Sequence, residues 1–173
     1  MSSTPLSIDA LAERLPAKAR LIGVDLGTKT IGLALSDVER RVATPLGVVK
    51  RTRFAKDAEA LSARICEFGA FALVVGLPLN MDGGAGPRVQ ATRAFLRNFA
   101  RLDPIPVVLW DERLSTAAVE RALIANDVSR ARRAAVVDQM AAAYILQGAL
   151  DRLAGLARLP PRDAGVTKLD FAR

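Results

Sequence analysis

Alternation of apolar and small or polar residues is the clearest pattern in the first third of the chain. Residues 21–26 and 31–36 alternate with the period of two that is typical of β-strands, and residues 42–49 continue the pattern. The connections are short, and one of them, residues 37–41, is rich in charged residues. Three strands joined in this way predict an antiparallel meander. Pro45 predicts an edge position for the third strand, because proline cannot donate a ladder hydrogen bond.

The period changes from strand to helix after this meander. Apolar residues recur at helical spacing from residue 54 to residue 68, and Gly69 is expected to end that helix. The remaining pattern predicts strands at 71–77 and 107–112, and helices at 88–102, 116–126 and 134–153. Strands alternating with helices add parallel pairs to a meander. The predicted fold is therefore α/β, with a mixed five-stranded sheet of three antiparallel and two parallel strands, flanked by helices on both faces.

Length and composition place this fold in one domain. We expect a domain over residues 20–154, because 173 residues suit a single core. An N-terminal extension covers residues 1–19 and contains a short amphipathic stretch at 8–15. The glycines and prolines of residues 155–173 indicate a C-terminal tail.

Charge and the rare residue types narrow the function. The net charge of +7 favours a polyanionic partner, above all nucleic acid, although a basic surface that is merely solvated would give the same total. The absence of histidine excludes histidine-based catalytic triads and histidine metal ligands. The single cysteine, Cys66, excludes a disulfide framework, and its helical context predicts a buried thiol. There is no apolar run long enough for a membrane span and no secretory signal, so we expect a cytoplasmic protein without a membrane partner.

Acidic residues in apolar surroundings are the candidates for chemistry. Asp25 ends the first strand, Asp111 and Glu112 end the last one, and Asp138 lies within an apolar helix. A carboxylate in such a setting is costly unless it is paired or binds a metal. Asp25 could instead cap a turn, and Asp138 could belong to a narrow polar stripe with Gln139. Neighbouring strand residues face opposite sides of a sheet, so only one of Asp111 and Glu112 can join Asp25.

Such carboxylates could form an oxygen-rich site for Mg²⁺ or Mn²⁺, which supports phosphodiester cleavage without histidine. Several residues beside the acids could contact phosphate groups. They are Thr28, Lys29, Asn80, Arg113, Arg130, Arg132 and Arg133. The three arginines before the last helix could equally be a solvated linker.

Four ordered motifs resemble the YqgF/RuvX family of the ribonuclease H-like superfamily. They are GVDLGTK (residues 23–29), VGLPLNMDG (75–83), DERLS (111–115) and VDQMAA (137–142), and ILQG (145–148) follows the last. The resemblance covers residues 21–153. It implies a ribonuclease H-like fold and an acidic metal site of Asp25, Glu112 and Asp138, with Glu112 preferred over Asp111.

The resemblance also implies a role in maturing the 5′ end of the 16S ribosomal RNA precursor, on the free RNA or on a ribosomal precursor particle. Three alternatives compete with this metal-dependent endonuclease. A Holliday junction resolvase would act on branched DNA, as a dimer rather than a monomer, because a four-way junction has two-fold symmetry. A nucleic-acid-binding factor would retain the fold with an inactive site. A sugar-kinase or chaperone-type ATPase shares the DLGT sequence of residues 25–28, but the chain is too short for two lobes and lacks a second such motif.

Overall fold

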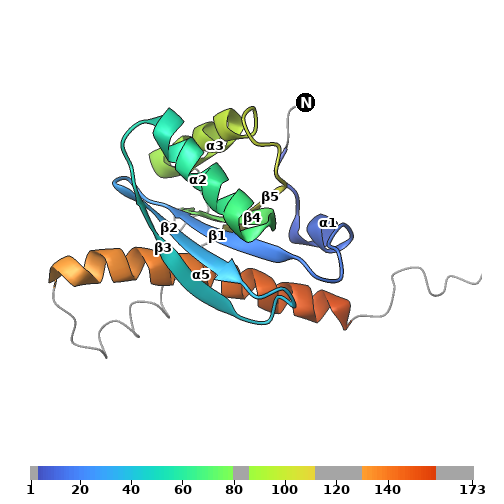
Figure 1. Ribbon diagram of the computed structural model, residues 1–173. Helices are drawn as coiled ribbons and strands as arrows, with labels where there is room; N and C mark the ends of the chain where they lie inside the picture. Colours follow the sequence, from blue (N-terminus) through green and yellow to red (C-terminus); the bar gives the residue numbers. More distant parts are fainter. Residues whose placement is uncertain (1–3, 80–85, 112–129, 159–173) are drawn as a thin grey trace, which may run out of the picture.

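The computed structural model describes residues 4–79, 86–111 and 130–158, with only the helical path given for 130–139 (Figure 1). The elements are α1 (Ile8–Ala12), β1 (Arg20–Leu26), β2 (Thr30–Ser36), β3 (Ala43–Lys50), α2 (Phe54–Phe68), β4 (Ala70–Leu77), α3 (Pro87–Phe99), β5 (Val107–Asp111) and α5 (Arg130–Ala157). The helix predicted at 116–126 lies outside the described residues.

The five strands form one mixed sheet in the order β3-β2-β1-β4-β5. The pairs β1–β2 and β2–β3 are antiparallel, whereas β1–β4 and β4–β5 are parallel. This arrangement confirms the predicted fold class of a meander extended by two parallel strands. It also confirms the edge position of β3, where Pro45 lies opposite Ala34 of β2.

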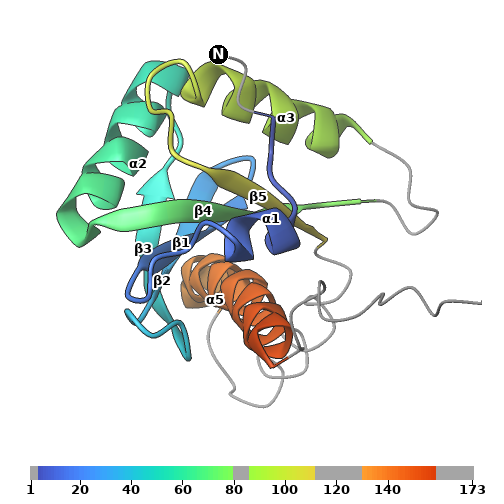
Figure 2. The same ribbon diagram turned by 90° about the vertical axis from the view of Figure 1, so that its right-hand side faces the viewer.

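Helices cover both faces of the sheet (Figure 2). The helices α2 and α3 lie on one face, over a core that includes Ile22, Val24 and Phe99. On the other face α5 packs across the sheet, over a core that includes Leu21, Val74 and Leu146. Residues 21–24 alternate between these two cores, as strand geometry requires. Because both faces are buried, β1 and β4 consist almost wholly of apolar or small residues.

Some helix boundaries differ from the predictions. The last helix begins at Arg130 rather than residue 134 and runs through Ala157. The arginines that could have been a linker therefore belong to its first turn, because arginine is a good helix former. Helix α3 ends at Phe99, earlier than predicted, whereas Gly69 ends α2 in the left-handed conformation, with φ of 57°. Cys66 is exposed, which corrects the expected burial: it follows Ile65, and the next helical position turns away from the core.

The segment before β1 packs against the domain. The backbone N–H of Leu6 donates to the carbonyl oxygen of Val107 at 2.7 Å, and Leu11 of α1 is fully buried in the core beneath α5. The domain limits inferred from the sequence stay predictions. None of the helices in the described residues has both the length and the apolar character needed to span a membrane.

Candidate functional site

The carboxyl ends of β1, β4 and β5 lie at one edge of the sheet, because these three strands are parallel. Asp25 lies near the end of β1, and Asp111 is the last residue of β5. Ligand sites in open α/β sheets collect at such an edge. Asp25 and Asp111 therefore lie at the same edge, separated by β4, at about 10 Å given the usual strand spacing.

Asp25 faces the side of the sheet that α5 covers. It alternates with Leu21 and Gly23, and Leu21 belongs to the core beneath α5. At Gly23 the helix approaches so closely that a Cβ atom would lie 2.6 Å from the carbonyl oxygen of Ala142. Asp25 is half-buried, and Gly32 of β2 lies directly opposite it. The absence of a side chain at Gly23 thus lets α5 approach β1 closely beside this carboxylate.

The direction of α5 brings residue 138 towards Asp25. The Gln147 side chain accepts a hydrogen bond from the backbone N–H of Ala43 at 2.9 Å. Ala43 pairs with Ser36, whose hydroxyl accepts from the backbone N–H of Leu21. Gln147 therefore lies near the start of β1. Further along β1, Gly23 approaches Ala142, so α5 runs antiparallel to β1. The step from residue 23 to 25 spans about 7 Å of strand, and four helical residues span about 6 Å. Asp138, one turn before Ala142, is therefore placed level with Asp25.

Asp111 faces the opposite side of the sheet from Asp25. Its strand neighbours at alternate positions, Val107 and Leu109, pack against the core beneath α2 and α3. Val108 belongs to the core beneath α5, and Trp110 packs against it. By this alternation Asp111 is directed away from the surface that carries Asp25.

The turn after Asp25 carries Thr28 and Lys29, both of which are exposed. Gly27 is required for its tight form, because a Cβ atom there would lie 2.8 Å from the carbonyl oxygen of Thr30. Exposed backbone and a lysine at this position can meet a phosphate group. The structure therefore places both predicted phosphate contacts next to Asp25.

Arg51 also contacts this turn, and the sequence did not predict it. Its Nη1 donates to the carbonyl oxygen of Gly27 at 2.7 Å, and its backbone N–H donates to that of Lys29 at 2.9 Å. Its guanidinium also lies 3.5 Å from Asp57 Oδ2, a carboxylate whose side chain is 3% exposed. An acid in the first turn of α2 was the only signal in the sequence, and helix N-termini commonly carry acids without such a partner.

The other predicted site residues lie outside what the structure describes in side-chain detail. Asn80, Glu112 and Arg113 are outside the described residues. Arg130, Arg132, Arg133 and Asp138 belong to the part of α5 for which only the helical path is given. Within the described residues no three acidic or cysteine side chains gather as a metal site would require. Of the three predicted metal ligands, Glu112 and the side chain of Asp138 lie outside this described part.

Comparison with known proteins agrees with the fold. A family model described as "RuvX: Holliday junction resolvase" matches residues 19–152. A protein of Beijerinckia indica named "Putative pre-16S rRNA nuclease" is 61% identical over 163 residues, covering 94% of this chain and 99% of its own. A protein of Paracoccus denitrificans with the same name is 57% identical over 152 residues, covering 88% of this chain and 96% of its own.

A solved structure shares the architecture at low sequence identity. It is RuvC of T. thermophilus in complex with a Holliday junction substrate, with a TM-score of 0.52 and 18% identity, covering 79% of this chain and 96% of that one. This likeness supports the ribonuclease H-like fold. The family model spans all five strands and most of α5. This chain belongs to the RuvX family of nucleases.

Proposed function

We propose that the chain is a metal-dependent endonuclease that processes the 5′ end of pre-16S rRNA in the cytoplasm. The observation that carries the proposal is the position of Asp25, half-buried on the sheet face where α5 brings residue 138 level with it. The highly identical relatives named as pre-16S rRNA nucleases support the RNA substrate.

The proposed metal site consists of Asp25, Glu112 and Asp138. Asp111 faces the other side of the sheet, which supports Glu112 as the ligand from this strand end. The donor set fits a hard divalent ion, because it contains only carboxylate oxygens and the chain has no histidine. Mg²⁺ and Mn²⁺ suit such ligands, and either ion supplies charge stabilisation and an activated water when it is bound.

The substrate contacts follow from the turn and from α5. Thr28 and Lys29 are exposed beside Asp25, where they would bind a phosphate next to the scissile bond. Asn80 and Arg113 follow β4 and β5 in the sequence. They would contact the nucleic-acid backbone on the side of Asp25 opposite to Lys29. Arg130, Arg132 and Arg133 lie in the first turn of α5, at the end that approaches Asp25, and would hold the nucleic acid there.

Cleavage of a DNA four-way junction is the second candidate function. It is favoured by the description of the matching family as a Holliday junction resolvase. A resolvase would act as a homodimer, whereas a nuclease of precursor RNA can act as a monomer, on the free transcript or on a precursor particle. A binding factor with an inactive site is disfavoured, because Asp25 and the tight turn after it are intact.

The test is cleavage of end-labelled precursor RNA and of a DNA junction by the wild-type protein and Asp25→Asn, with Mg²⁺ or Mn²⁺. We expect cleavage of the RNA near the mature 5′ end by the wild type alone. Cleavage of the junction alone would replace the proposed substrate by branched DNA. Equal binding of both substrates by both proteins without any cleavage would favour the binding factor.

A further inference from the structure

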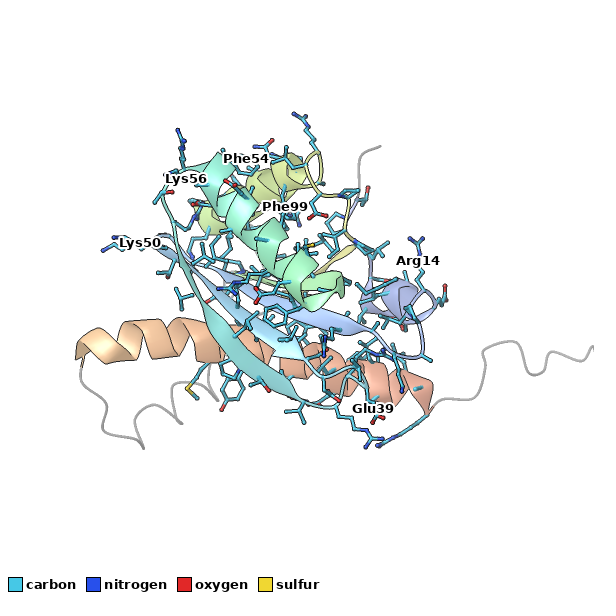
Figure 3. The ribbon with its side chains drawn as sticks, in the orientation of Figure 1. Arg14, Glu39, Lys50, Phe54, Lys56 and Phe99 are labelled. Carbon is cyan, nitrogen blue, oxygen red and sulfur yellow. The ribbon has the colours of Figure 1, made fainter. Side chains whose placement is uncertain are left out.

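Basic side chains gather where β3 joins α2, next to the turn that follows Asp25. Lys50 ends β3, Arg53 precedes α2, and Lys56 lies in its first turn. All three are exposed, and within the described residues none of them forms an ion pair. Lys50 pairs with Thr30, so it lies beside Lys29. In Figure 3, Lys50 and Lys56 occupy one end of the molecule, and Arg14 and Glu39 the other. We call Lys50, Arg53 and Lys56 the β3–α2 basic corner.

Buried contacts hold this corner against the candidate site. Asp57 Oδ1 accepts a hydrogen bond from the backbone N–H of Thr52 at 2.9 Å, and its other oxygen faces Arg51. Arg51 in turn donates a hydrogen bond to the carbonyl oxygen of Gly27, and its guanidinium lies 5.8 Å from the ring centre of Phe95 in α3. Asp57, the acid nearest in the sequence to these cations, is therefore paired with Arg51 and does not neutralise the β3–α2 basic corner. Glu59 is the one exposed acid in the first two turns of α2.

The location of these cations is unfavourable for stability. A helix N-terminus carries a partial positive charge, so acids are favoured in its first turn and a lysine there is repelled. Arg53 occupies the N-cap of α2 without a side-chain capping bond, although that position prefers an oxygen acceptor. Packing and helix capping thus give no reason for basic residues here. A polyanion bound at the corner does give one.

We propose that the β3–α2 basic corner is a second part of the nucleic-acid surface and binds the phosphodiester backbone of the substrate a few nucleotides from the scissile bond. This inference rests on the proposed function and extends it, because Asp25 and Lys29 define where the cleaved phosphate lies and the corner continues from Lys29. The first turn of α5 lies at the same end of the molecule (Figure 1), so nucleic acid would contact the protein on both sides of Asp25. Phosphate contacts of this kind fix position without reading sequence.

The test compares a triple variant with a control of equal charge. Lys50→Ala/Arg53→Ala/Lys56→Ala removes the corner, and Arg14→Ala/Lys18→Ala/Arg158→Ala removes three exposed cations elsewhere. Binding of labelled precursor RNA and of a DNA junction is measured by anisotropy from 50 to 200 mM salt without divalent ions. For each substrate that the wild type binds, we expect the corner variant to raise Kd about tenfold or more at low salt and to lower the salt slope by about 2 to 3. The control should change Kd less than about threefold, since its residues lie outside the proposed nucleic-acid surface.

Two further measurements separate this inference from the proposed function. The cleavage rate at saturating substrate should stay within about twofold of the wild type, since the corner does not touch the scissile phosphate. The melting temperature of the corner variant should equal or exceed that of the wild type, because the repulsion at the start of α2 is removed. Equal Kd values and salt slopes for the corner and control variants would overturn the inference. A wild-type protein that neither binds nor cuts either nucleic acid would instead overturn the proposed function.

Discussion

Arg51 Nη1 donates a hydrogen bond of 2.7 Å to the carbonyl oxygen of Gly27, two residues after Asp25. This bond ties the end of β3 to the turn that carries Thr28 and Lys29. Arg51 itself is held by Asp57, so a buried carboxylate at the start of α2 determines where the turn lies. We therefore expect Arg51 to act as a positioning residue, through the backbone of the turn rather than through contact with the substrate.

Replacement of Arg51 separates its two roles. Arg51→Met should destabilise the protein by about 1–3 kcal/mol, because it leaves the buried carboxylate of Asp57 without its partner. Adding Asp57→Asn should recover most of that loss, since the neutral amide oxygen still accepts from Thr52. Activity should stay low in the double variant, because the bond to Gly27 is still missing. Chemical denaturation and steady-state kinetics test this together; full activity in the stable double variant would rule out a positioning role.

Gly23 controls the distance between β1 and α5. In Gly23→Ala the new Cβ atom would meet the carbonyl oxygen of Ala142, which as helix backbone cannot rotate away. We expect a loss of stability of about 1–3 kcal/mol from this overpacking, and a lower cleavage rate because Asp138 moves relative to Asp25. Gly155→Ala in the same helix is the control, since nothing lies within 4 Å of its position. That control should be more stable by up to about 1 kcal/mol with unchanged activity, as measured by thermal unfolding and cleavage assays.

Asp37 makes the stability of the β2–β3 connection dependent on pH. The backbone N–H groups of Val42 and Arg41 donate to its carboxylate at 2.9 and 2.7 Å, and these bonds hold the pKa of Asp37 below its ordinary value of 3.8. A lowered pKa stabilises the folded state above pH 4, and this contribution is lost as the pH falls through the folded value. Asp37→Asn should therefore cost less than about 1 kcal/mol at pH 7, because the carboxyl is exposed. Unfolding curves should show a smaller difference in the free energy of unfolding between the wild type and Asp37→Asn at pH 3 than at pH 7. An equal difference at both pH values would refute a role for the charge of Asp37.

The opposite orientations of neighbouring strand residues give a prediction for the end of β5. Asp111 faces the core beneath α2 and α3, so Asp111→Asn should retain most of the cleavage activity. Glu112→Gln should abolish activity, with a loss of about a thousandfold or more, because it removes a proposed metal ligand. Both variants keep the size of the side chain, and circular dichroism checks that both fold. The reverse order of effects would assign the ligand to Asp111.

Strand and helix periodicity predicted most of the fold correctly. The alternation in residues 21–36, Pro45 in an edge strand and Gly69 after α2 each act through local geometry, so they can be read without a structure. The start of α5 was predicted too late, because arginines that interrupt an apolar pattern can still continue a helix. The exposure of Cys66 was missed because it lies one position beyond the apolar stripe.

The candidate site was less predictable than the fold. Asp25 stood out, because a carboxylate at the end of an apolar strand needs a reason. Alternation alone left the choice between Asp111 and Glu112 open, and only the family resemblance favoured Glu112. The orientation of Asp111 depends on which face of the sheet α5 covers, and that follows from contacts such as Gly23 with Ala142. Arg51 and Asp57 could not be recognised, because their contact with the turn at Gly27 brings together segments 24 residues apart.

Asp25, Glu112 and Asp138 are proposed to act together as one metal site. Single-turnover cleavage of the precursor RNA with saturating Mg²⁺ or Mn²⁺ tests it most directly, for Asp25→Asn, Glu112→Gln, Asp138→Asn and the triple variant. Residues that act as a unit give losses that do not add. We predict that each single variant loses about as much activity as the triple variant. A single variant that cleaves at close to the wild-type rate would contradict the claim.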